Sequence, residues 1–250
     1  MPSASPKLVA RSPVRKRSTP SQSVRASAAD STAADPAIAT ESMTSVFLFV
    51  PNLIVYARIL LVFVGFAAAD YRVTVASYLI SRLLLDVADG LAARAFNQCS
   101  TFGTILDMVT DCASTTCLCV VMAPLYPEHV LFLVFLVGLD LFSHWFHMSA
   151  SLLLGLDSHK ECTNALLRCY YWKPVLYLTV SGTELWYMSL FVLKHTNGPL
   201  VPGLGVSLVP ALYYVCLPIW AFKQVVNVVQ FAVACLVLVE HDEKKRAKIA

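Results

Sequence analysis

The chain has 250 residues and a formal net charge of +3; 57% of its residues are hydrophobic and only 14% are charged. A soluble domain carries about a quarter charged residues. This composition, with its long apolar runs, therefore predicts an all-α, polytopic membrane protein and excludes an ordinary soluble domain. No basic patch with interleaved aromatics suggests nucleic-acid binding. The eight cysteines form no C-x-x-C pair, which is typical of small buried hydrophobes rather than a disulfide framework or zinc site.

Residues 1–44 differ from the rest of the chain. They are rich in Ser, Ala and Pro, and six Lys or Arg residues precede the first acid, Asp30. Such a segment cannot bury enough apolar surface to fold, so it is predicted to be a disordered basic tail. Its arginine- and serine-rich start is also typical of an organellar transit peptide. Four prolines within the first 20 residues argue against the amphipathic helix that such a peptide needs, which favours a cytosolic tail.

Six apolar segments follow and predict six transmembrane helices. Their approximate bounds are 46–69, 73–95, 102–122, 129–156, 174–193 and 206–239. The last segment is expected to be interrupted at Pro210 and Pro218. Residues 45–240 are therefore predicted to form one membrane domain, and residues 241–250 a charged cytosolic tail.

The stretch from Asp86 to Asp111 (DVADGLAARAFNQCSTFGTILDMVTD) holds four aspartates between apolar runs. Acids at membrane depth are costly and usually mark ion or substrate chemistry. If two antiparallel helices meet at a turn near residues 97–100, Asp89 and Asp107 lie at matching depths. Asp86 and Asp111 then form a second matched pair about one helical turn away. Spacings of three and four residues keep each pair on one helix face, so the pattern predicts a four-carboxylate cluster of the kind that Mg2+ prefers.

Arginines near these acids allow two interpretations. Arg82 and Arg94 could hold a purely structural helix pair, but two cations do not easily neutralise four buried acids. On the first segment, Asn52 and Arg58 are unusual so deep in an apolar run. They could be a helix-start residue and an arginine reaching the interface, or a polar edge that faces the acid cluster and meets a phosphate. The second interpretation is favoured.

The fourth segment carries Asp140, Ser143, His144 and His147 on neighbouring faces. The two histidines, three residues apart, could ligate a metal, but such residues are more often hydrogen-bonded interior groups. The set is a plausible pocket for substrate hydroxyls.

The basic residues predict the orientation. The basic tail, the 95–101 turn, the 157–173 connection and the C-terminal Lys/Arg run fall on one side of a six-span chain. The opposite turns hold only Arg72, Lys194 and His195. By the positive-inside rule, both termini are cytosolic. The acid cluster then lies in the cytosolic half of the bilayer, and the six helices surround a cytosol-facing polar cavity.

The acidic stretch carries a motif with fixed spacing, D-x2-D-G-x2-A-R-x8-G-x3-D-x3-D, which the chain fits without a gap. The matching residues are Asp86, Asp89, Gly90, Ala93, Arg94, Gly103, Asp107 and Asp111. This pattern resembles the signature of the CDP-alcohol phosphotransferases, integral membrane enzymes of phospholipid synthesis.

The resemblance implies roles for these residues. Asp86, Asp89 and Asp107 would bind Mg2+ or Mn2+, and Asp111 would act as the general base and touch a second metal. The CDP moiety of CDP-diacylglycerol would be held by Asn52, Arg58, Gly90, Ala93 and Arg94.

Segments outside the motif bear on the acceptor. FLFVPNLIVYARI, LDLFSHWFH and DSHK resemble the eukaryotic branch of the family that makes phosphatidylinositol. That likeness implies CDP-diacylglycerol and myo-inositol as substrates, CMP as by-product, the endoplasmic reticulum membrane and a homodimer. The candidate acceptor pocket comprises Asp140, Ser143, His144 and Lys160.

Two departures and two alternatives accompany this interpretation. Cys112 and Lys173 stand where arginines are expected, which bears on acceptor affinity and choice. The same chemistry with glycerol 3-phosphate or serine is one alternative; a phosphorylated acceptor needs a cationic pocket, which only Lys160, Arg168 and Lys173 could supply. A divalent-cation transporter is the other, although a cation path has no need of Gly90-x2-Ala93-Arg94.

Overall fold

The structure is a computed structural model that describes residues 45–154, 164–203 and 205–249. The chain divides into two units, Met1–Ser42 and Met43–Ala250, and the described residues belong to the second. The predicted tail of residues 1–44 and the candidate residue Lys160 lie outside the described residues. The regular elements described are helical apart from one isolated bridge, Leu200–Ser207, which confirms the all-α class.

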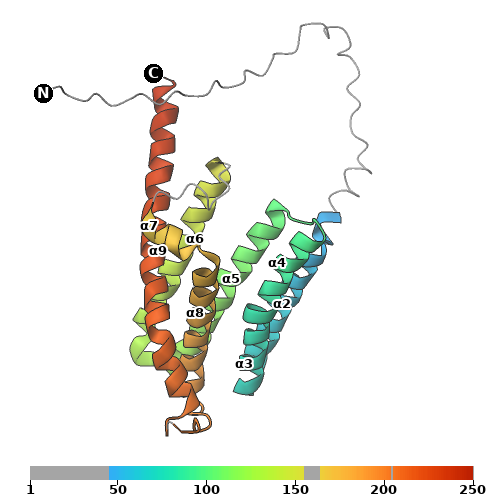
Figure 1. The fold of residues 1–250 in the computed structure, drawn as a ribbon, viewed down its shortest axis with the longest axis vertical. Coiled ribbons are helices and arrows are strands. Elements are labelled where there is room, and N and C mark those ends of the chain that lie inside the picture. Colours follow the sequence, from blue (N-terminus) through green and yellow to red (C-terminus); the bar gives the residue numbers. More distant parts are fainter. Residues whose placement is uncertain (1–44, 155–163, 204, 250) are drawn as a thin grey trace, which may run out of the picture. The chain divides into compact units, whose positions relative to one another are not determined.

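The helices follow one another with short connections (Figure 1). In chain order they are α2 (Val50–Ala67), α3 (Tyr71–Leu79), a π-helix (Ile80–Leu85), α4 (Asp86–Ala95), α5 (Thr101–Met122), two 3-10 turns (Ala123–Leu125 and Pro127–His129), α6 (Val130–Leu154), α7 (Ala165–Tyr170), α8 (Lys173–Leu193) and α9 (Leu208–Ala247). The α3, π and α4 segments are consecutive, so residues 71–95 form one composite helix beside the turn that leads into α5.

The helices are those of a multi-pass membrane protein. Five helical segments among the described residues are long and apolar enough to cross a membrane: Val50–Ala67, Thr101–Leu125, Pro127–Leu153, Lys173–Leu193 and Leu208–Ala247. The composite helix 71–95 is not among them; it is divided into three pieces and carries several charged residues. The count of six spans therefore remains a prediction.

The expected interruption of the last segment is wrong. Helix α9 runs continuously for 40 residues with Pro218 inside it. Pro210 lies in the first turn, where backbone N–H groups have no intrahelical partner in any case. Pro218 removes one hydrogen bond, which a membrane helix tolerates when neighbouring groups satisfy the freed carbonyl. The helix also continues to Ala247, so residues 241–247 extend α9.

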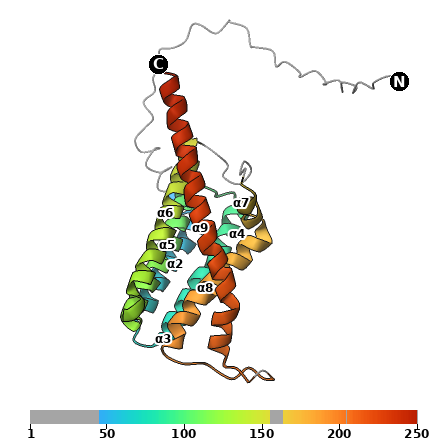
Figure 2. The ribbon, with the colours of Figure 1, turned by 90° about the vertical axis from the view of Figure 1, so that its left-hand side faces the viewer.

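Two groups of helices face each other across α5. Helix α2 packs against α3, α4 and α5, whereas α9 packs against α6 and α8, and α5 also contacts α6. The turn between α4 and α5, α7 and the C-terminal end of α9 lie at one end of the bundle (Figures 1 and 2). The connection between α8 and α9 lies at the other end, next to an apolar core that includes Leu118, Met122, Trp186 and Phe191.

The turn between α4 and α5 also fixes the start of α2. Asn97 adopts a positive φ of 52°, a conformation that asparagine tolerates better than most residues. The Ser100 side chain accepts a hydrogen bond from the Gly103 N–H at 3.0 Å and caps α5. Gln98 Oε1 accepts from the Val50 N–H at 2.8 Å. The N-termini of α2 and α5 are thereby tied to one turn.

Candidate functional site

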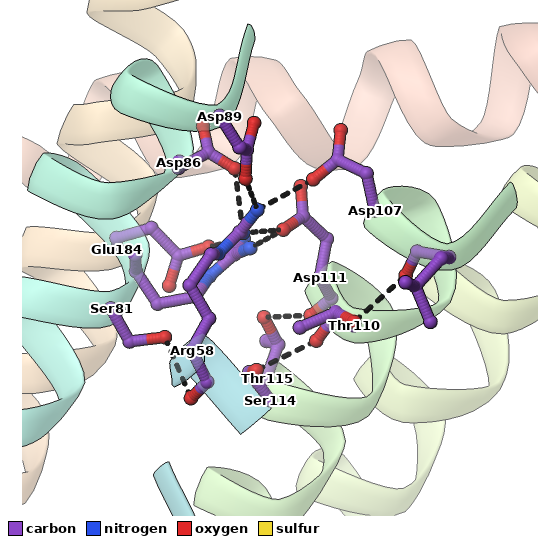
Figure 3. Close-up of polar contacts among 12 residues, drawn as sticks. Arg58, Ser81, Asp86, Asp89, Asp107, Thr110, Asp111, Ser114, Thr115 and Glu184 are labelled. Atoms are coloured by element: carbon purple, nitrogen blue, oxygen red, sulfur yellow. Dashed lines mark hydrogen bonds and ion pairs between the residues drawn. The ribbon is translucent and has the colours of Figure 1, made fainter. Parts of the chain in front are cut away.

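The four motif aspartates surround one arginine from α2 (Figure 3). Arg58 is fully buried, and its Nη1 donates to Asp89 at 2.5 Å and Asp107 at 2.6 Å. Its Nη2 donates to Asp86 at 2.6 Å and Asp111 at 2.5 Å. Each guanidinium nitrogen thus takes one of the two pairs that the spacing places at matching depth. The structure brings the four carboxylates together, and Arg58 neither reaches the membrane interface nor stays at the edge of the cluster.

A second arginine joins the cluster to α8. Arg82 contacts Asp111 and also donates to Glu184 at 2.6 Å. The Tyr78 hydroxyl donates to the other oxygen of Glu184 at 2.6 Å. Among the described residues, the network therefore contains five carboxylates and two guanidinium groups, which leaves an excess of three negative charges if all are ionised. An excess of this size in a largely buried site favours binding of a further cation, and a purely structural set of ion pairs does not explain it.

The π-helix positions Arg82. It occupies Ile80–Leu85, and within it Ser81 and Arg82 are buried. Ser81 Oγ donates to the backbone carbonyl of Arg58 at 3.2 Å, so the segment also contacts α2 directly. Single π-turns inside helices occur frequently at functional sites, and this one directly precedes Asp86. No pattern in the sequence indicated it.

The carboxylates suit a hard divalent cation. Asp86, Asp89 and Asp107 each offer an oxygen, and these atoms lie within 4.8 Å of one another. Each carboxylate uses only one oxygen for Arg58. The side chain of Asp89 is 7% exposed and that of Asp107 is 43% exposed, so the group opens to one side. An all-oxygen donor set with an open side is what Mg2+ or Mn2+ requires when substrate phosphates complete its shell.

A cavity of about 220 Å³ opens beside Asp89 and Asp107, between α2, α4 and α5. Four of the five predicted nucleotide-binding residues line it: Asn52, Gly90, Ala93 and Arg94. The fifth, Arg58, lies in the acid cluster instead and does not line this cavity. Residues from the first turns of α2 and α5 complete the wall, so two helix N-termini and Arg94 surround it. Helix N-termini and arginine both favour phosphate groups.

Two motif glycines serve this cavity differently. A Cβ at Gly103 would lie 2.8 Å from Oδ1 of Asn52, so the glycine allows α2 and α5 to approach closely. Asn52 is itself buried, and its Nδ2 donates to the Val46 carbonyl at 2.7 Å. At Gly90 a Cβ would meet nothing closer than the Arg94 guanidinium at 3.6 Å. Gly90 therefore leaves open space in the cavity rather than a close helix contact.

A second, smaller cavity of about 80 Å³ lies on the other side of Asp111, between α5, α6, α8 and α9. Of the predicted acceptor residues, Asp140 and His144 line it. Ser143 is fully buried and its hydroxyl donates to Gln230 at 3.4 Å, so it links α6 to α9 and does not line the small cavity. The structure adds residues that sequence reasoning had not assigned to a pocket, among them Thr183, Glu184, Lys223 and Gln224.

This small cavity adjoins a large one of about 660 Å³. The two share Asp111, His144 and Tyr170, and the large one extends to residues 99–101 in the turn before α5. His147 lies along it and is hydrogen-bonded to the Tyr171 hydroxyl at 3.1 Å. His144 Nδ1 is hydrogen-bonded to the Asp140 carbonyl at 2.8 Å. Both histidines are therefore hydrogen-bonded interior groups, as the sequence favoured.

Cys112, Asp140 and His144 also bring possible metal-binding atoms within 4.8 Å of one another. Their sulfur, oxygen and nitrogen donors contrast with the all-oxygen set around Arg58. Lys223 lines the same small cavity, and its ammonium group would repel a cation there. Lys223 thus favours a hydrogen-bonding ligand over a second metal at this position.

The comparisons with known proteins agree with the motif. The family model of CDP-alcohol phosphatidyltransferases matches residues 48–161. The chain is 39% identical over 209 residues to CDP-diacylglycerol–inositol 3-phosphatidyltransferase of Homo sapiens, covering 82% of this chain and 97% of the relative. Identity to the proteins of the same name is 38% over 204 residues in Drosophila melanogaster (81% and 90% covered) and 40% over 214 residues in Candida albicans (82% and 89%). No solved structure matched the chain.

Proposed function

Because the chain belongs to the CDP-alcohol phosphatidyltransferase family, we propose that it transfers the phosphatidyl group of CDP-diacylglycerol to myo-inositol, giving phosphatidylinositol and CMP. One observation carries the proposal: the four motif carboxylates converge on Arg58 between a cavity suited to a nucleotide diphosphate and a polar cavity suited to an alcohol. The inositol-specific names of the relatives support the choice of acceptor.

On the donor side, the CDP moiety occupies the cavity between α2, α4 and α5. Arg94 and the N-termini of α2 and α5 favour its phosphates, and Gly90 and Ala93 leave room for the cytidine. Asp86, Asp89 and Asp107 would hold Mg2+ or Mn2+, and Asp111 adjoins these three carboxylates. A bound metal would supply positive charge that neutralises the diphosphate and stabilises the leaving phosphate during in-line attack by an alcohol. Arg58 fixes the positions of all four carboxylates from the centre of the cluster.

Asp111 is suited to the role of general base. Arg58 and Arg82 both contact its Oδ1, so among the described residues Oδ2 keeps its lone pairs for another partner. An inositol hydroxyl attacks the phosphorus that bears the diacylglycerol. Its proton passes to Asp111 while the bond to the CMP oxygen breaks.

Charge favours a neutral acceptor over glycerol 3-phosphate. Acids outnumber basic side chains around the small cavity: Asp111, Asp140 and Glu184 against Arg82 and Lys223. Arg168 and Lys173, two of the cations that could have served a phosphate, are exposed and line neither cavity. We assign Asp140 and His144 to the acceptor pocket, with Ser143 supporting them and Lys160 as a further candidate.

Arg58 also argues against a divalent-cation transporter. Its guanidinium lies at the centre of the acid cluster, within 2.6 Å of each carboxylate. A permeating ion would have to displace this buried positive charge. Transport would appear as metal flux into liposomes without any lipid product.

The test uses purified protein, Mg2+ or Mn2+, and CDP-diacylglycerol with myo-inositol, serine or glycerol 3-phosphate in turn. CMP release and a new phospholipid are expected with myo-inositol. Absence of CMP release with myo-inositol would overturn the proposal, and release with serine or glycerol 3-phosphate instead would identify the alternative acceptor.

The family resemblance and the distribution of basic residues also support a proposal for the membrane arrangement. We place the protein in the endoplasmic reticulum as a homodimer, with both termini and the acid cluster on the cytosolic side. Residues 45–240 form its membrane domain, preceded by the basic tail 1–44 and followed by the charged tail 241–250. The basic C-terminal end of α9 and the turn after Arg94 lie at one end of the bundle (Figure 2), which agrees with the positive-inside rule.

A further inference from the structure

Lys223 is a buried lysine that has no carboxylate partner among the described residues. It lies in the middle of α9, is 7% exposed, and lines the small cavity beside Asp111. Its Nζ donates to Oδ1 of Asn227 at 2.5 Å and lies 5.6 Å from the centre of the Tyr170 ring. It forms no ion pair with any described carboxylate. A buried ammonium that forms no ion pair is costly. An ammonium has three donors, so two have no partner among the described residues and remain for a ligand.

Two further residues bear on the ligand: Asn227, which links Lys223 to the cavity residue Asp140, and Thr183, which lines the cavity. Asn227 donates from Nδ2 to Oδ1 of Asp140 at 3.3 Å. Through Asn227, the Lys223 ammonium on α9 is held at a fixed distance from the Asp140 carboxylate on α6. Across the cavity, the Thr183 hydroxyl is buried and has no hydrogen-bond partner among the described residues. Buried polar groups are rarely left unsatisfied, so the spare donors of Lys223 and the Thr183 hydroxyl indicate a ligand with several hydroxyls.

We propose that Lys223 is a specificity-determining residue for the acceptor alcohol: it donates to hydroxyls on one edge of a neutral cyclic polyol, while Asp140 accepts from a neighbouring hydroxyl. This inference rests on the proposed function and deepens it. The small cavity takes the edge of the ring that is attacked, because it adjoins Asp111. The rest of the ring occupies the large cavity, which shares Asp111, His144 and Tyr170 with the small one.

The other polar side chains that line the small cavity are less suited to donate to the alcohol than Lys223. Arg82, the other cation lining the small cavity, already contacts Asp111 and Glu184. Cys112 contributes no charge of its own as a thiol. Both terminal nitrogens of Arg82 are thus occupied, whereas the Lys223 ammonium keeps two donors beyond its bond to Asn227 among the described residues. A lone ammonium of this kind suits hydroxyls better than a dianionic phosphate.

The test compares Lys223→Met with Lys223→Arg in purified protein, varying myo-inositol and CDP-diacylglycerol separately. In Lys223→Met the KM for myo-inositol should rise tenfold or more, while the KM for CDP-diacylglycerol stays within twofold. Lys223→Arg, which keeps the charge and the donors, should recover most of this loss. Lys194→Met, an exposed lysine at the opposite end of the bundle, serves as the matched control and should change neither constant.

A second measurement needs no variant. Deoxyinositols that each lack one hydroxyl should differ widely as acceptors for the unaltered protein, and the worst should lose at least tenfold in kcat/KM. An unchanged KM for myo-inositol in Lys223→Met, or an equal rise in both KM values, would overturn the inference. If Lys223→Met does not fold, uniform use of all deoxyinositols would overturn it. Should the unaltered protein fail to use myo-inositol at all, the proposed function fails instead.

Discussion

The two sides of Asp111 are built in different ways. The donor side draws its residues from Asn52 to Asp111, and its central part is one motif with fixed spacing on two consecutive helices. The acceptor side takes single residues from α5, α6, α8 and α9, which are separated by up to about half of the chain. Local helix geometry thus determines the donor side, whereas packing of distant helices determines the acceptor side. Substitutions on one side should therefore change the KM for one substrate only, except at Asp111, where the two sides meet.

Asp111→Asn should have the largest effect, because it removes the proposed base where the two sides meet. The amide keeps the shape but cannot accept the proton, so kcat should fall by about 10²- to 10⁴-fold. CDP-diacylglycerol binding should be largely intact, since the donor cavity is lined by Asp89 and Asp107 rather than Asp111. Turnover and equilibrium binding of the nucleotide measure the two effects. Near-normal turnover would remove Asp111 from the base role.

Asp89→Asn should impair the donor side alone. Asp89 is one of the proposed metal ligands and also lines the nucleotide cavity. Loss of one charged contact costs about 1.5–3 kcal/mol, or about ten- to a hundredfold. Both the Mg2+ concentration for half-maximal rate and the KM for CDP-diacylglycerol should rise by such factors. The KM for myo-inositol should stay constant, and a parallel rise in it would contradict the separation of the two sides.

Gly90→Ala should weaken nucleotide binding without loss of fold. A methyl group there meets nothing closer than 3.6 Å but occupies part of the donor cavity. The expected rise in the KM for CDP-diacylglycerol is about fivefold, equivalent to about 1 kcal/mol. The thermal unfolding midpoint in detergent should be unchanged.

The matched variant is Gly103→Ala, whose added methyl would lie 2.8 Å from Asn52. It should lower the unfolding midpoint because α2 and α5 must move apart. Similar unfolding losses in both variants would show that Gly90 is also a packing glycine.

The donor side could be predicted from the sequence because its geometry is local. A turn between two helices and spacings of three or four residues suffice to place Asp86, Asp89, Asp107 and Asp111 together. The position of Arg58 at their centre could not be predicted, since it depends on how α2 packs against both helices. Nor could the π-helix that turns Arg82 toward Asp111, because its formation depends on contacts outside Ile80–Leu85.

On the acceptor side the sequence indicated which residues were unusual but not which of them meet. Glu184 and Lys223 are isolated ionisable residues in apolar segments, a pattern that marks functional sites in membrane helices. That signal placed neither beside Asp140, because the register of α8 and α9 against α6 comes from tertiary packing. Ser143 illustrates a related difficulty. It precedes His144 by one residue on α6, but this single step turns its side chain away from both acceptor cavities, which His144 lines.

Ser143→Ala should have the smallest effect and tests how far the acceptor side extends. The hydroxyl is fully buried, lines neither acceptor cavity, and its bond to Gln230 is long at 3.4 Å. Its loss should cost about 1 kcal/mol of unfolding free energy or less. The KM for myo-inositol should change by less than about twofold. Ser143 can act on the large cavity only through Gln230, and losing this one contact should change the binding free energy by well under about 1 kcal/mol. A tenfold rise would mean that the acceptor site continues behind α6. The polyol would then be held by Ser143 and Gln230, and the edge defined by Lys223 and Asp140 would be only part of its site.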